Sequence, residues 1–247
     1  MPLGLAPQVT AALALALLGA AYVRGYSGFG FSAIFIACAA LVTNPLPLIP
    51  VVFACEILMT VFQARGIRGH VDWLRAGVLL LGAALVLPFS VAAILSVGDN
   101  AARLAVSGII FVMALLLLAG VTLKRPLGLP AHGTVGMAAG LCNAAGVGGL
   151  PVATFLTAQP VPPARFRATM IVFLTGIDLM TLPLMARGGL VTTSTLAGVA
   201  LALPVVTLGV WAGSRRFAAA SPASFRRLAV LLLLALSGIG LLRGVWG

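Results

Sequence analysis

Long apolar blocks, separated by short polar segments, run through almost the whole chain. The first covers residues 9–43 and the second covers about 48–63. A helix needs about 20 mainly apolar residues to cross a bilayer, so blocks of about this length predict membrane helices. The later blocks lie at about 76–97, 104–123, 133–158, 168–186, 189–213 and 228–246. The pattern predicts an all-α polytopic membrane protein.

Two of these blocks are interrupted by glycines. Residues 25–30 (Gly-Tyr-Ser-Gly-Phe-Gly) divide the block at 9–43, and residues 143–149 (Asn-Ala-Ala-Gly-Val-Gly-Gly) divide the block at 133–158. The second block has 26 residues, too few for two full spans. We therefore predict that each block forms a broken-helix hairpin that turns at its glycines.

The two halves of the chain resemble each other. Four short segments of the first half recur in the same order in the second, at spacings of 115 to 124 residues. The pairs are 27–30 with 145–148, 45–47 with 160–162, 85–88 with 201–204, and 103–106 with 227–230. We predict an N-terminal repeat at 1–123, a linker at 124–132 and a C-terminal repeat at 133–247.

Composition excludes a soluble protein. Of the 247 residues, 62% are hydrophobic and 8% are charged, whereas a soluble domain carries about 25% charged residues. The net charge is +11, but the basic residues are scattered between apolar blocks, which argues against a nucleic-acid partner. Cys38, Cys55 and Cys142 lie inside apolar blocks without metal spacing, so we predict no metal site and no cofactor.

Loop charge predicts the orientation of the chain. The loops at 65–75 and 214–227 carry three and four arginines, which places them in the cytoplasm under the positive-inside rule. The loop at 97–103 has one arginine and one aspartate and is assigned to the outside. Each half is then one hairpin plus three spans, and the odd number makes the second half inverted. The sequence predicts a multi-pass protein of the cell inner membrane, with both termini outside.

Inverted repeats with broken helices are typical of secondary transporters, which bind substrate where the half-helices meet. Free N–H groups at helix N-termini suit an anion. We predict a substrate site from both breaks: Arg24, Gly25, Tyr26, Ser27, Gly28, Phe29, Gly30, Asn143, Ala144, Ala145, Gly146, Val147, Gly148 and Gly149. A second interpretation stays open, that these glycines only allow close helix packing.

Polar side chains near the breaks have alternative interpretations. Arg24 is interpreted either as a bidentate contact to the anion or as an interfacial residue whose charge reaches water. Tyr26, Ser27 and Asn143 either donate to the substrate or cap the broken helices.

The only acids within the predicted spans are Glu56 and Asp178. They are interpreted as proton-coupling groups, as partners of Arg24, or as members of structural hydrogen bonds. His70 and His132 fall in predicted loops and are expected to face solvent.

The duplicated glycine motif resembles the TauE/SafE sulfite exporter family. Its copies here are Gly25-x-x-Gly28-x-Gly30 and Gly140-x5-Gly146-Val147-Gly148-Gly149, and the stretch from Gly66 to Trp73 also looks like a family loop. Two departures are Phe31, where many members have glycine, and Leu150-Pro151 after the second copy.

The resemblance implies a transporter, and the expected substrate follows from the family and not from composition. It implies export of a small sulfur-containing anion, such as sulfite or an organosulfonate like sulfoacetate. The expected partners are this anion and the lipid bilayer. Alternatives are a passive anion channel or an importer of a related anion. No ATP-binding motif is present, and no nucleophile with a base lies in the spans, so we predict that the chain is not an enzyme.

Overall fold

The computed structural model describes residues 7–96, 99–120, 122–217, 234 and 238, and every regular element within them is helical. Five stretches are long and apolar enough to cross a membrane: Pro7–Ser27, Leu46–His70, Trp73–Ser96, Pro163–Arg187 and Thr193–Arg215. The all-α, multi-pass prediction is confirmed. The helices are α1 (Pro7–Ser27), α2 (Phe31–Val42), α3 (Ile49–Ile67), α4 (Trp73–Ser96), α5 (Asp99–Ala119), α6 (Leu129–Asn143), α7 (Gly149–Thr157), α8 (Pro163–Arg187) and α9 (Thr193–Phe217), with 3-10 turns η1 (Leu46–Leu48) and η2 (Arg68–His70).

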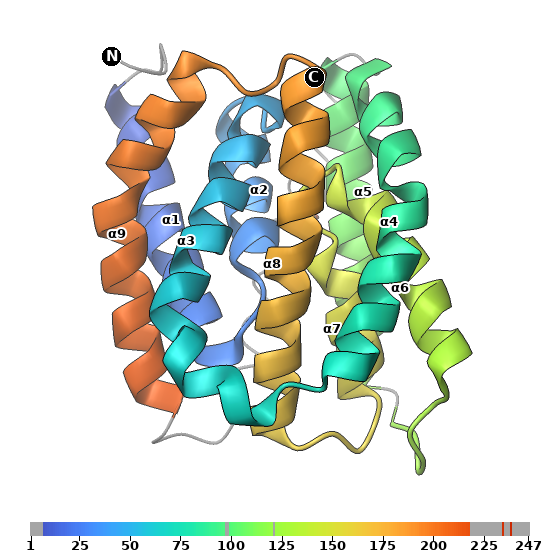
Figure 1. Ribbon diagram of the computed structural model, residues 1–247. Helices are drawn as coiled ribbons and strands as arrows, with labels where there is room; N and C mark the ends of the chain where they lie inside the picture. The colour runs from blue at the N-terminus through green and yellow to red at the C-terminus, as the bar shows by residue number, and fades with distance from the viewer. Residues whose placement is uncertain (1–6, 97–98, 121, 218–233, 235–237, 239–247) are drawn as a thin grey trace.

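The long helices stand side by side in one bundle, with α1 and α9 at one side, α4 and α6 at the other, and α3 and α8 between them (Figure 1). Large apolar side chains cover its outer surface. Leu81, Phe89, Leu196 and Leu208 are each more than 60% exposed. Water would not favour such a surface, whereas lipid tails do, so these faces are those of membrane helices.

Both predicted helix breaks are present. The chain leaves the helical conformation between α1 and α2 at Gly28 and Gly30, whose φ angles are 84° and 90°. Between α6 and α7 it does so at Gly146, with φ of 78°. Side chains rarely tolerate these angles, so glycine is needed at all three turns. The helices that flank the two breaks differ in length, since α1 before the first break has 21 residues and α7 after the second break has only 9.

Glycines also bring pairs of helices from the two halves into close contact. α1 packs along α9, and α4 packs along α6. On α9, Gly213 faces the backbone carbonyl of Tyr22, and on α6, Gly136 faces that of Leu79. A Cβ at either glycine would collide with the facing carbonyl. Small residues that allow backbones to approach are a recognised means of joining membrane helices.

The prediction for His132 is wrong. α6 begins at Leu129 and so includes the last residues of the predicted linker. His132 has no exposed surface, its Nδ1 lies 2.9 Å from the carbonyl oxygen of Gly128, and its ring meets Phe155 edge-on at 4.8 Å. The early helix start turns the imidazole onto α7 instead of into solvent. His70, in η2, is exposed as predicted.

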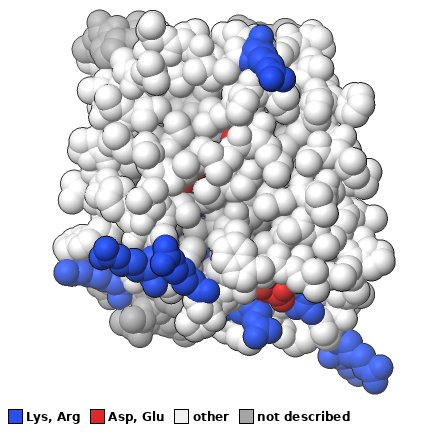
Figure 2. All heavy atoms as spheres, in the orientation of Figure 1, with Lys and Arg blue, Asp and Glu red and all other residues white. Residues whose placement is uncertain are grey.

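Basic side chains gather at the end of the bundle where α1 and α3 finish and α8 begins (Figure 2). Arg65, Arg68 and Arg215 are exposed there. We call this the basic end. Both termini, the arginines at 226 and 227, and the predicted last span at 228–246 apart from residues 234 and 238 lie outside the described residues. The structure therefore does not address those predictions.

Candidate functional site

The first break is held by the hydroxyl of Ser27. Its Oγ lies 2.8 Å from the carbonyl oxygen of Val23 and 2.9 Å from that of Phe29, and it accepts a hydrogen bond from the Phe29 N–H at 3.3 Å. These bonds satisfy backbone groups that the end of α1 leaves free. The geometry supports the capping interpretation of Ser27.

Arg24 lies one turn before this break and has no exposed surface. Its Nη1 donates to Oε1 of Glu56 at 3.2 Å, and its Nη2 donates to Oγ1 of Thr60 at 3.3 Å. The guanidinium therefore does not reach an interface, so the snorkelling interpretation is wrong. Glu56 is a partner of Arg24, as one interpretation held, and contact between Arg24 and a substrate stays a prediction.

Thr60 links α3 to α8. Its Oγ1 lies 2.7 Å from Oγ1 of Thr175, and each Oγ1 also lies within hydrogen-bond distance of the carbonyl oxygen one turn before it in its own helix. Each hydroxyl has one hydrogen, so one threonine donates to the other and the second donates to its own helix. Hydroxyls that bond back to the helix leave no polar atom facing lipid. The two threonines thus join the long helices at the centre of the bundle.

Asp178 lies on α8, one turn beyond Thr175, and has no exposed surface. Its carboxyl lies close to the carboxyl of Glu56, the guanidinium of Arg24 and the side-chain amide of Asn143. Neither carboxyl oxygen makes a hydrogen bond of standard geometry to a described group. Asp178 therefore belongs to the same buried polar region as these three residues.

The second break has a buried polar side chain beside it, as the first has Arg24, and this side chain is Asn143. Asn143 donates from Nδ2 to Oγ1 of Thr181 at 2.9 Å, and its side chain covers Gly148. The N–H groups of Gly146 and Val147 bond carbonyls at the end of α6. Every residue of 143–149 is buried. The predicted anion-binding role of this break stays a prediction.

Buried polar side chains therefore connect the two breaks. The chain of contacts runs from Arg24 through Glu56 to Asp178, and from there to Asn143. We call these four residues the buried polar cluster. It contains two carboxyls and one guanidinium. Unpaired charge inside a membrane protein is costly, so ionisable groups buried there are candidates for a functional site.

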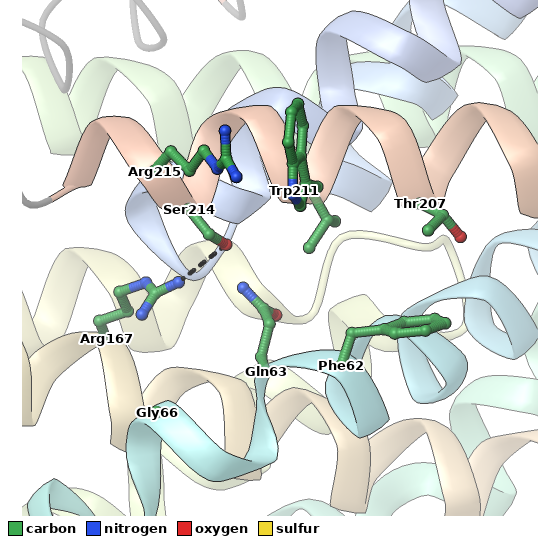
Figure 3. Close-up of a pocket in the computed structure, with 9 residues that line it drawn as sticks. Phe62, Gln63, Gly66, Arg167, Thr207, Trp211, Ser214 and Arg215 are labelled. Carbon is green, nitrogen blue, oxygen red and sulfur yellow. Dashed lines mark hydrogen bonds between the residues drawn. The ribbon is translucent and has the colours of Figure 1, made fainter.

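A second feature was not predicted from the sequence. A cleft of about 480 Å³ opens between α3, α8 and α9 at the basic end (Figure 3). Arg167 lies in its wall and donates from Nη2 to the carbonyl oxygen of Gly25 at 2.8 Å and to Oγ of Ser214 at 3.3 Å. The cleft thus reaches the first break. Its described lining is Phe62, Gln63, Gly66, Arg167, Thr207, Val210, Trp211, Ser214 and Arg215.

The sequence offered one signal for this cleft. Gln63 is a polar residue in an apolar span, at the position that the repeat aligns with Asp178. Thr207 fell inside a predicted span, and Arg167, Ser214 and Arg215 fell in loops that loop charge assigned to the cytoplasm. No spacing rule connects residues of α3, α8 and α9. Proximity of these three helices comes only from the tertiary structure.

Comparison with known proteins supports one family. The family model described as Sulfite exporter TauE/SafE matches residues 13–241. The matched range includes both breaks, the buried polar cluster and the cleft. No curated protein and no solved structure matches the chain.

Proposed function

Because the chain belongs to the sulfite exporter TauE/SafE family, we propose that it is a secondary transporter that exports a small sulfur-containing anion across the inner membrane. Sulfite and organosulfonates such as sulfoacetate are the proposed substrates. The observation that carries the proposal is the buried polar cluster, whose Arg24 lies next to a helix break inside an apolar bundle. Charged groups at membrane depth are costly and mark transport pathways in membrane proteins.

The proposal includes inverted repeats. In Figure 1, α1 begins at the end of the bundle opposite to the end where α6 begins. In the proposed repeats, α1 corresponds to α6 and α4 corresponds to α9. Exchange of the two halves therefore turns the contact of α1 with α9 into the contact of α6 with α4. Thr60 and Thr175 are 115 positions apart, which is also the spacing of the proline segments 45–47 and 160–162. The two threonines are hydrogen-bonded to each other. Equivalent residues that meet are expected on a two-fold axis, which supports inversion.

The proposed orientation puts the basic end in the cytoplasm and both termini outside. Arg65, Arg68 and Arg215 are exposed at that end, and the positive-inside rule favours the side with more basic loops. With a negative cell interior, the membrane potential favours exit of an anion from that side.

The buried polar cluster also supports proton coupling. An oxyanion that binds Arg24 competes with Glu56 for the guanidinium. The released carboxylate would be buried without a partner, so uptake of one proton by Glu56 or Asp178 keeps the charge balanced. Loss of the anion on the other side restores the ion pair and frees the proton. Anion movement and proton movement are thereby linked.

Reconstituted proteoliposomes test the transport proposal. Vesicles are loaded with sulfite, sulfoacetate, taurine, thiosulfate or sulfate, and efflux is followed with an imposed pH gradient and a potassium-valinomycin potential. We expect saturable efflux of a sulfur oxyanion that changes with both gradients. Asp178→Asn should retain flux, and it should lose the dependence on the pH gradient if Asp178 is the proton acceptor and keep it if Glu56 is. Lack of flux for every anion refutes the function, while single-channel conductance insensitive to pH indicates a channel.

A further inference from the structure

We propose that the cleft between α3, α8 and α9 is a binding site for an organic anion, in which Gln63 and Arg167 hold the oxyanion head group. The inference rests on the proposed transport function and adds a site outside both glycine breaks. It also predicts that an apolar stem on the anion contributes to binding. The residues of the cleft come from three helices that the sequence did not bring together.

Gln63 carries the argument. Its side chain is 6% exposed, yet neither amide atom has a hydrogen-bond partner among the described residues. Gln159 is also 6% exposed, but its Oε1 accepts from the Leu127 N–H at 2.9 Å and its Nε2 donates to the Phe155 carbonyl oxygen at 3.3 Å. Buried polar groups in proteins are almost always bonded. An unbonded amide that points into a cleft (Figure 3) therefore indicates a ligand.

The charge of the cleft selects an anion. Arg167 and Arg215 are both in the described lining, which contains no acidic residue. The Arg215 guanidinium stacks 3.9 Å above the Trp211 ring. The Ser214 hydroxyl donates to the carbonyl oxygen of Gly25 and accepts from Arg167, so it helps to hold Arg167 in place. Guanidinium and amide donors together suit the several oxygens of a sulfonate or similar head group.

The size and walls of the cleft favour an organic stem. A water molecule occupies about 30 Å³ of liquid volume, so a cleft of about 480 Å³ has room for roughly 16 waters. A sulfite ion has four heavy atoms and would leave most of this space unfilled. Phe62, Val210 and Trp211 provide apolar wall beside the polar end. A short alkyl chain bound there would leave water, which is favourable.

The cleft also lies beside the buried polar cluster. Arg167 bonds the carbonyl oxygen of Gly25, the residue after Arg24, and the two guanidinium groups are near enough to act on each other electrostatically. An anion in the cleft would therefore be attracted by both charges. The cleft is placed to receive the anion at the basic end before it reaches Arg24.

Binding of alkylsulfonates to the detergent-purified protein tests the inference. Titration calorimetry with methane-, ethane-, propane- and butanesulfonate should show affinity rising up to about fourfold for each added methylene. Gln63→Leu should weaken butanesulfonate binding at least tenfold without lowering the melting temperature, because an unbonded amide is removed. Trp211→Ala, at an exposed position, should reduce the gain per methylene.

Gln159→Leu is the matched control, since it makes the same change at the same exposure. It should lower the melting temperature, because bonded partners lose their amide, and leave butanesulfonate affinity unchanged. Wild-type affinity in Gln63→Leu, or an equal loss of melting temperature in both variants, overturns the inference.

Anionic lipid is the other source of an oxyanion head group. In neutral detergent without lipid, we expect the wild type to bind butanesulfonate, and phosphatidylglycerol to compete only weakly. Binding of phosphatidylglycerol without any alkylsulfonate binding would overturn the organic-anion site. Efflux from vesicles separates the two proposals. If the wild type and Gln63→Leu show equal efflux, the cleft site is rejected and the transport function stands. If sulfonates bind but no anion leaves the vesicles, the transport function is rejected and the cleft site stands.

Discussion

Removal of Arg24 should destabilise the protein more than removal of its partner Glu56. The structure gives the reason, since one guanidinium faces two carboxyls inside the bundle. Glu56→Gln leaves Arg24 with Asp178, so one positive charge still balances one negative charge. Arg24→Met leaves two buried carboxyls with no cation. The two single variants therefore break the same ion pair but do not leave the same charge imbalance.

The magnitude follows from burial and distance. Arg24 and Glu56 have no exposed side-chain surface, and the ion pair is 3.2 Å long. Loss of one partner from a buried pair costs about 3–5 kcal/mol, so we expect Arg24→Met to lose about that much. Glu56→Gln keeps an amide oxygen that accepts from Arg24, and its loss should stay below about 2 kcal/mol. Asp178→Asn added to Arg24→Met should recover part of the loss.

Unfolding of the protein in mixed detergent micelles by sodium dodecyl sulfate measures these free energies. Arg65→Met is the matched control, because Arg65 is exposed at the basic end and its loss should cost less than about 0.5 kcal/mol. If Glu56→Gln costs as much as Arg24→Met, Asp178 does not compensate Arg24 and the three-residue account is refuted.

The remaining predictions concern packing and the centre of the bundle. Gly213→Leu should prevent α1 from packing on α9, because any Cβ collides with the Tyr22 carbonyl, and monodisperse protein should be lost in gel filtration. Gly19→Leu on α1 meets open space and should behave as the wild type in the same measurement. Thr175→Val should destabilise the protein by about 1 kcal/mol, and Thr60→Val should cost more, because Thr60 also accepts from Nη2 of Arg24. The double variant should lose less than the sum of the two single losses, because both changes remove the same hydrogen bond; additive losses in the unfolding titration would contradict this.

Most of the helical architecture followed from the sequence. Spans at 168–186 and 189–213 were found because membrane helices are read from uninterrupted apolar length, and that signal is local. The breaks at 25–30 and 143–149 were found because positive φ angles require glycine, which is visible in the sequence. Helix ends were less well predicted, since α8 begins at Pro163 and its first turn contains arginine.

The site was predicted only where it is local in the chain. Arg24 and Asn143 were selected because each stands near a break, and the structure connects them through Glu56 and Asp178. The ion pair of Arg24 with Glu56 was only one of several interpretations, because the rotation of each helix about its axis decides which side chains meet, and the sequence does not give that rotation. His132 was misplaced for a similar reason, since the start of a helix determines the face on which each residue lies.

The break glycines have two structural roles, helix packing and chain reversal, at different positions, and their role in anion binding stays a prediction. Gly25 faces the backbone of Val210, where a Cβ would collide, so it serves the packing of α1 on α9. Gly28 and Gly146 have positive φ and serve the turns. The same close approach at Gly25 brings its carbonyl to Arg167 and Ser214 in the cleft. Packing and polar contact are therefore one structural feature at this residue.

Gln63 and Asp178 occupy corresponding positions in the proposed repeats but have different surroundings. Gln63 faces the cleft at the basic end, whereas Asp178 has no exposed surface. Two equivalent halves with one open side and one closed side are what alternating access requires of an inverted-repeat transporter. If the halves exchanged their conformations, the region around Asp178 would open and the cleft would close. Under the proposed transport function, the different surroundings of Gln63 and Asp178 would correspond to binding at one end of the bundle and release at the other.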